Sequence, residues 1–72
     1  SNMKSLPAKR VVAILEGNGF VLSRTRGSHA IYRNNTSGIS VPVSLHGKNK
    51  AIPIGTFLAI VKQSKIGKEQ FH

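Results

Sequence analysis

The first apolar residues of the chain recur at the spacing of one helix face. The positions i, i+3, i+4 and i+7 are filled by Ala8, Val11, Val12 and Leu15. The opposite side carries Lys9, Ala13 and Glu16. We expect Ser5 to cap this helix, with Pro7 in the first turn, where the missing N–H of proline has no partner to lose. The sequence Gly17-Asn18-Gly19 predicts its end, because glycine and asparagine accept the left-handed backbone conformation.

Three stretches that favour β-structure follow, at residues 20–25, 29–33 and 39–43. The first two are joined by the short turn Arg26-Gly27-Ser28, and a group of turn residues at 34–38 leads into the third. This spacing predicts a three-stranded antiparallel meander. Pro42 cannot donate a ladder hydrogen bond, so the third strand should lie at an edge of the sheet or end close to that residue.

A second amphipathic helix is predicted after a polar, basic loop at residues 44–50, and Pro53 and Gly55 introduce it. One face of this helix is expected to carry Ile54, Phe57, Leu58 and Val61. The residues expected to point away from it are Ala59, Lys62 and Gln63. The tail from Gly67 is short, and we expect it to be loosely held.

Helix, three strands and helix predict a two-layer α+β domain of the order α-β-β-β-α, with both helices on one face of the sheet. This is the outline of the double-stranded-RNA-binding domain. Readers of duplex RNA need a lysine cluster at the second helix, and only Lys62 and Lys65 are available here. Contact with single-stranded RNA is therefore the better expectation. We expect a single domain over residues 3–72 and interpret Ser1-Asn2 as an expression scar.

The charge of the chain narrows the class of partner. Eleven Lys and Arg residues against two Asp and Glu residues give a formal net charge of +9 in 72 residues. Such a field attracts polyanions, so RNA is the first expected partner and an acidic protein is the second. No membrane role is expected, because the cations are not gathered on one helix face and the apolar runs are too short for a span. The chain has no cysteine, which fits a reducing interior, and we expect it in the cytoplasm.

The segment Arg24-Thr25-Arg26-Gly27-Ser28-His29 is the main candidate for chemistry. His29 can take and give a proton near neutral pH, and Arg24 and Arg26 can hold anionic oxygens beside it. Gly27 permits close approach of the backbone to a ligand, and Ser28 supplies a hydroxyl. Attack of a ribose 2′-hydroxyl on its own phosphate needs a base, a proton for the leaving oxygen and cations, which suffice without a metal. The alternative is that His29 is an ordinary strand-end histidine.

The loop at residues 45–50 adds a second imidazole and two ammonium groups. Lys48 and Lys50 are candidate phosphate contacts, and the alternative is that they form a solvated charge run. His46 could take part in acid–base catalysis beside His29, but we assign no role to it. Tyr32 could stack an unpaired base or pack against a neighbouring strand.

Strand alternation constrains where His29 can point. His29, Ile31 and Arg33 belong to one side of their strand, whereas Ala30 and Tyr32 belong to the other. The pattern does not decide which of the two sets faces the helices. In both cases we expect His29 to be accessible at the end of its strand.

Three segments together resemble a known family: RTRGSHAIY at residues 24–32, VPV at 41–43 with HG at 46–47, and IGTFLAIVKQ at 54–63. They look like the corresponding segments of the HicA toxins of bacterial and archaeal toxin–antitoxin pairs, and the likeness covers nearly the whole chain from Met3. The resemblance implies a domain of the double-stranded-RNA-binding type that cleaves mRNA without a cofactor. It also implies a HicB antitoxin that binds the toxin and covers its site, and it places the family's functional histidine at His29.

The chain departs from the family pattern at two positions near the second helix. Many relatives have proline beside the Gly-Thr of this helix and glycine near its end, whereas this chain has Ile54 and Lys65. Neither change touches His29. The sequence therefore predicts an endoribonuclease toxin, and the competing hypotheses are a non-catalytic RNA-binding module and a domain that binds an acidic protein.

Overall fold

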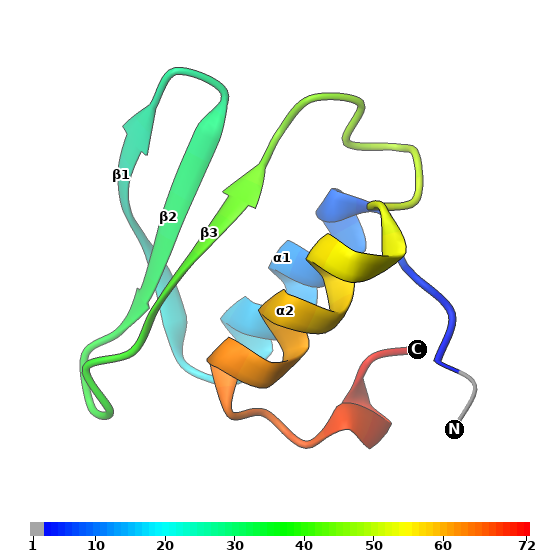
Figure 1. Ribbon diagram of the computed structural model, residues 1–72. Coiled ribbons are helices and arrows are strands. Elements are labelled where there is room, and N and C mark those ends of the chain that lie inside the picture. The colour runs from blue at the N-terminus through cyan, green and yellow to red at the C-terminus, as the bar shows by residue number, and fades with distance from the viewer. Residues whose placement is uncertain (1–2) are drawn as a thin grey trace.

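The computed structural model describes residues 3–72, so the interpretation of Ser1-Asn2 as a scar lies outside it. The secondary-structure elements are α1 (Ala8–Gly17), β1 (Phe20–Arg26), β2 (His29–Asn34), β3 (Ser40–Ser44), α2 (Ile54–Ser64) and the short 3-10 helix η1 (Lys68–Gln70). The strands form one antiparallel sheet in the order β1-β2-β3. Both α-helices lie on the same side of this sheet (Figure 1). The predicted two-layer α-β-β-β-α fold is confirmed.

The core lies between the sheet and the two helices. Alternate residues of β2 and β3 turn toward the helices and are buried, namely Ala30, Tyr32, Val41 and Val43. The helix α1 packs against β1 and β3, and α2 packs against β3. Pro42 faces the other side of β3, which is an edge strand, so its missing donor costs no ladder hydrogen bond within the sheet.

The start of α1 differs from the prediction, whereas its end agrees. Pro7 occupies the N-cap position without a side-chain capping bond, and Ser5 lies too far upstream to cap. The Ser5 hydroxyl instead donates to the main-chain carbonyl of Ile52. At the other end Asn18 is the C-cap, and Gly19 has a φ of 89°, so the predicted stop is confirmed.

The buried face of α2 is rotated from the predicted one. Ile54 and Leu58 are 51% and 44% exposed, so two of the four predicted core positions are wrong. The buried residues are Phe57, Ile60, Val61 and Ser64. The apolar pattern did not indicate this face, because one of its four residues, Ser64, is polar. Its hydroxyl donates to the carbonyl of Val61 at 2.8 Å and accepts the N–H of Ile66 at 3.1 Å, which allows it to be buried.

The C-terminal tail is not loosely held, so that prediction is wrong. Phe71 is only 5% exposed and meets Phe57 edge-to-face, with ring centroids 5.9 Å apart and an interplanar angle of 86°. The guanidinium of Arg10 donates to the carbonyl of His72 at 2.9 Å. The tail therefore closes the end of the core between α1 and α2.

Lys65 ends α2 in the left-handed conformation, with a φ of 62°. A residue with a Cβ pays a steric cost there that glycine avoids. We expect Lys65→Gly to raise the free energy of unfolding by about 0.5–1 kcal/mol, which urea denaturation would measure as a higher midpoint. The control is Lys62→Gly inside the helix, which should cost about 1 kcal/mol. A lower midpoint for Lys65→Gly would contradict the assignment of backbone strain.

Candidate functional site

His29 is the first residue of β2 and follows a two-residue hairpin turn. Arg26 and His29 are paired across the end of the hairpin, and Gly27 and Ser28 form the turn between them. Gly27 has a φ of 58°, a conformation that is strained for residues with a side chain. The turn thus brings a guanidinium-bearing residue directly opposite an exposed histidine.

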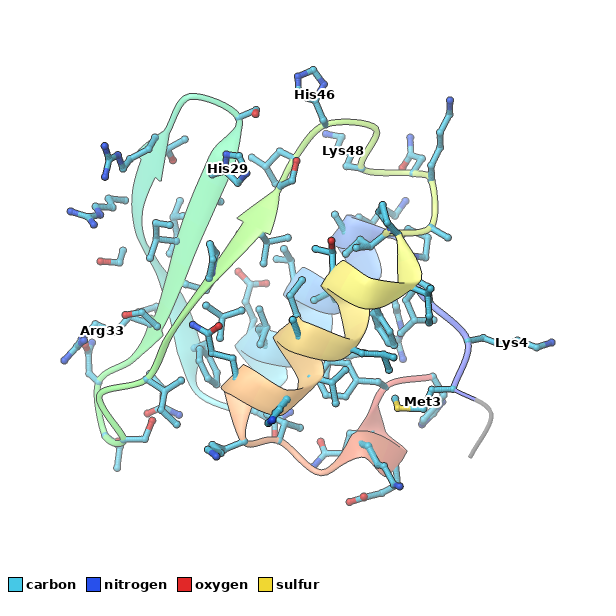
Figure 2. All side chains as sticks on the ribbon, in the orientation of Figure 1. Met3, Lys4, His29, Arg33, His46 and Lys48 are labelled. Atoms are coloured by element: carbon cyan, nitrogen blue, oxygen red, sulfur yellow. The ribbon has the colours of Figure 1, made fainter. Side chains whose placement is uncertain are left out.

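The structure resolves the question of which side of β2 faces the helices. Ala30 and Tyr32 are in the core, so His29, Ile31 and Arg33 belong to the opposite side of the strand. Figure 2 shows Arg33 directed away from the helices. His29 lies at the very end of this strand and is exposed.

A β-bulge in β1 brings two more arginines to the side of the sheet that faces away from the helices. The pairing register shifts between Leu22 and Arg24, so that Arg24 lies opposite Ile31 and Arg26 opposite His29. Cross-strand partners share a face, so both arginines lie on the same side as Arg33. We call Arg24, Arg26 and Arg33 the arginine face.

The loop of residues 45–50, called here the basic loop, is held against the hairpin turn and α1. The N–H of Leu45 donates to the carbonyl of Ser28 at 2.7 Å, and the N–H of Lys9 donates to the carbonyl of Lys48 at 3.2 Å. Figure 2 shows the labelled side chains of His29, His46 and Lys48 at the same end of the molecule. Hydrogen bonds of the main chain therefore place the basic loop beside His29.

A cavity of about 460 Å³ lies at this end, between the strand ends, the basic loop and the start of α2, and we call it the His29 cavity. Its volume is in the range of small-ligand sites. The cavity lies beyond the ends of the strands, where residues from either side of the sheet can border it; its polar and cationic residues are His29, Ser44, His46, Lys50 and Thr56. The other residues that border it are Gly47, Ala51, Ile52, Pro53 and Ile60.

The predicted site residues fall into two neighbouring groups. His29 and Lys50 border the His29 cavity, whereas Lys48 lines a shallower hollow on the basic loop together with Lys50. Arg24 and Arg26 lie on the arginine face, and Gly27 and Ser28 form the turn that joins the two surfaces. Ser44 and Thr56 were not predicted as site residues, because they approach His29 only through strand pairing and helix packing.

The comparison with protein families decides the classification. Residues 8–66 match the family described as HicA toxin of bacterial toxin–antitoxin. The chain belongs to the HicA toxin family. No curated protein matches the chain.

Every predicted site residue of this HicA toxin lies inside the matched region, whereas Phe71 lies beyond it. The family consists of toxins of toxin–antitoxin pairs, so a partner antitoxin is implied. The match therefore supports the predicted class of protein. Phe71, outside the matched region, packs against Phe57 in the structure of this chain.

Tyr32 of this HicA toxin is not available to stack an unpaired base. Its side chain is in the core and 8% exposed, so the cross-strand packing alternative is the correct one. Burial raises the pKa of the Tyr32 phenol, and the nearby negative charge of Glu16 raises it further. The phenol of the folded protein is therefore neutral near neutral pH.

Residues 3–72 of this HicA toxin contain neither a metal-binding cluster nor a membrane-spanning helix. No group of three or more His, Asp or Glu side chains in this range is placed to hold a metal ion. Within the same range, neither α-helix has the length and apolar character needed to cross a membrane.

Proposed function

We propose that this HicA-family toxin is an endoribonuclease that cleaves mRNA, with His29 as general acid and base and without a metal ion or organic cofactor. The observation that carries the proposal is the position of His29. It is exposed at the end of β2, borders a cavity with Lys50 and lies opposite Arg26. A titratable ring beside cationic residues is an arrangement suited to phosphate chemistry.

The reaction uses a nucleophile that RNA supplies itself. The ribose 2′-oxygen attacks the adjacent phosphorus, so that the O2′–P bond forms and the P–O5′ bond breaks. His29 accepts the proton of the 2′-hydroxyl, and a proton must reach the departing 5′-oxygen. The pentacoordinate intermediate carries extra negative charge, which nearby guanidinium and ammonium groups stabilise.

The cations that hold the RNA are expected on two adjoining surfaces. Arg24 and Arg26 would contact phosphates along the arginine face, and Lys48 and Lys50 would contact them on the basic loop. The hairpin turn of Gly27 and Ser28 joins these surfaces next to His29, so we expect a single strand that spans both to pass this residue. The net charge of +9 supports binding to a polyanion.

Binding of this HicA toxin to single-stranded RNA should depend strongly on salt. With about three to five phosphate contacts, a plot of log affinity against log salt should have a slope of roughly −2 to −3.5. Fluorescence anisotropy with a labelled RNA at several salt concentrations measures this slope. The double variant Arg24→Gln/Arg26→Gln should flatten it by about 1.4, whereas Lys68→Gln, in η1, should not change it. A flat response of the unaltered protein would contradict the electrostatic role of these residues.

Incubation of the purified toxin with a long RNA in the presence of a chelator tests the function directly. The proposal requires discrete RNA fragments that accumulate with time. The arginine face favours a second candidate, a non-catalytic RNA-binding module, which would bind the same RNA and return it intact. Salt-dependent binding without cleavage would therefore select the second candidate.

The partner implied by the toxin–antitoxin family is proposed to be a HicB-type antitoxin that covers the His29 cavity and the adjoining cations. An acidic surface is suited to this position, because the toxin has eleven Lys and Arg residues against two Asp and Glu residues. Binding of such a partner would block access of RNA to His29.

A further inference from the structure

We propose that His46 is a second proton-transfer residue, so that His29 and His46 divide the two proton transfers of RNA cleavage at one phosphate. This inference rests on the proposed ribonuclease function and adds a residue for which the resemblance to HicA toxins gave no role. Its basis is that two histidines from separate segments of the chain border the same cavity.

The fold brings these two histidines together through main-chain contacts on both sides of the pair. His29 lies opposite Ser44 in the antiparallel ladder, where Cα atoms are about 5 Å apart. The next residue of the loop, Leu45, donates its N–H to the carbonyl of Ser28 at 2.7 Å. Residues adjacent to both histidines are therefore joined, and His46 follows this contact directly.

The basic loop is also anchored beyond His46. The N–H of Lys50 donates to the carbonyl of Gly47 at 2.8 Å, and Gly47 has a φ of 58°. The N–H of Ile52 then donates to the carbonyl of Leu6 at 3.0 Å. The backbone that carries His46 is thus held at both ends, which keeps the residue at the rim of the His29 cavity.

The side chain of His46 can still move. It is exposed, and Figure 2 shows its ring on the outer side of the loop, whereas His29 lies between the ends of β2 and β3 in that view. Exposed side chains exchange rotamers within picoseconds to nanoseconds. Rotation of His46 toward the cavity would place a phosphate between the two rings.

The geometry of the reaction favours two groups over one. The attacking 2′-oxygen and the leaving 5′-oxygen lie roughly in line on opposite sides of the phosphorus. A single imidazole at one side reaches only one of them without moving. Two imidazoles that border one cavity from separate segments can serve both oxygens in one step.

Two histidines account for both proton transfers of the step. The neutral ring takes the proton from the 2′-hydroxyl while the O2′–P bond forms. The protonated ring gives its proton to the 5′-oxygen while the P–O5′ bond breaks. The products are a 2′,3′-cyclic phosphate and a 5′-hydroxyl end, and the exchange of one proton with water restores both rings. Lys50, which borders the same cavity, is a cation for the phosphorane.

The dependence of kcat/KM on pH tests the division of labour. One neutral and one protonated group produce a bell-shaped profile, whereas one essential base produces a single rising limb. We expect His46→Gln to lower kcat/KM by about 100-fold or more and to remove one limb of the bell. His72→Gln is the matched control, because His72 is the remaining histidine and its hydrogen bonds, to Arg10 and Gln70, use main-chain atoms. It should keep the rate and the bell.

A substrate with sulfur in place of the 5′-bridging oxygen assigns the two roles. A thiolate is a far better leaving group than an alkoxide and needs no proton, since a thiol has a pKa of about 8.5. This substrate should restore the rate of whichever variant, His46→Gln or His29→Gln, lacks the general acid. Restoration of one variant and not the other supports the division, and restoration of both or neither contradicts it.

The outcomes separate this inference from the proposed function. If the unaltered protein leaves RNA intact, the ribonuclease function fails together with this proposal. If it cleaves RNA and His46→Gln keeps its rate and bell-shaped profile, only the role of His46 is overturned. A variant that loses rate but retains both limbs would also overturn proton transfer by His46, and would leave it a contact for RNA.

Discussion

His29→Ala is expected to abolish RNA cleavage while leaving the fold and the affinity for RNA largely intact. General acid–base catalysis contributes about 10²–10⁴ in rate, and loss of the ring removes that contribution. The side chain is exposed at a strand end, so its removal opens no cavity in the core. The arginine face and the lysines of the basic loop, which are the proposed phosphate contacts, remain in this variant.

Three measurements on the same preparation separate chemistry from structure. Fragment formation from a long RNA reports cleavage, anisotropy reports affinity, and the thermal midpoint reports the fold. His72→Ala is the control for the loss of a histidine elsewhere, because its backbone contact with Arg10 is retained. Cleavage that persists in highly purified His29→Ala protein would remove His29 from the mechanism.

Phe71→Ala is expected to have the largest effect on stability. Truncation of a buried phenylalanine costs about 3–5 kcal/mol, through lost apolar burial and the cavity left behind. Here it also removes the edge-to-face contact with Phe57, whose ring is fully buried. Domains of this kind have only about 5–15 kcal/mol of stability in total, so the variant should be close to unfolding.

Urea denaturation followed by far-UV circular dichroism measures this loss as a lower midpoint. Lys68→Ala is the matched control, since Lys68 is exposed in the same tail and its replacement should change stability by less than about 0.5 kcal/mol. An equally small effect for Phe71→Ala would mean that the tail is loosely held after all, as the sequence alone predicted.

The sequence predicted the elements well because their signals are local. The spacing of apolar residues predicted α1, and Gly17-Asn18-Gly19 predicted its end. Turn residues indicated the boundaries between the three strands. The predictions that failed depended on contacts between distant residues. Ser5 bonds to Ile52 instead of capping α1, and Phe71 packs on Phe57.

The prediction of the buried face of α2 also failed because it depends on tertiary contacts. Ile54 and Leu58 are apolar and have the spacing of a helix face, yet both are exposed because the sheet and the tail contact the neighbouring face. Ser64 lies on that neighbouring face and is buried because two local hydrogen bonds satisfy its hydroxyl. Apolar spacing alone cannot show which of two overlapping faces meets the core.

The sequence by itself determined the class of this protein: a small, basic α+β domain with the Gly-Ser-His segment of a HicA toxin. It also determined that His29 follows a tight turn, because Gly27 and Ser28 are local signals. Only the tertiary structure decided what surrounds His29. Simple alternation from the buried Phe20 would turn Arg24 and Arg26 toward the helices, and the bulge in β1 reverses this. Strand pairing and main-chain bonds of the basic loop then bring His46 and Lys50 to the same cavity, a juxtaposition that depends on residues far apart in the chain.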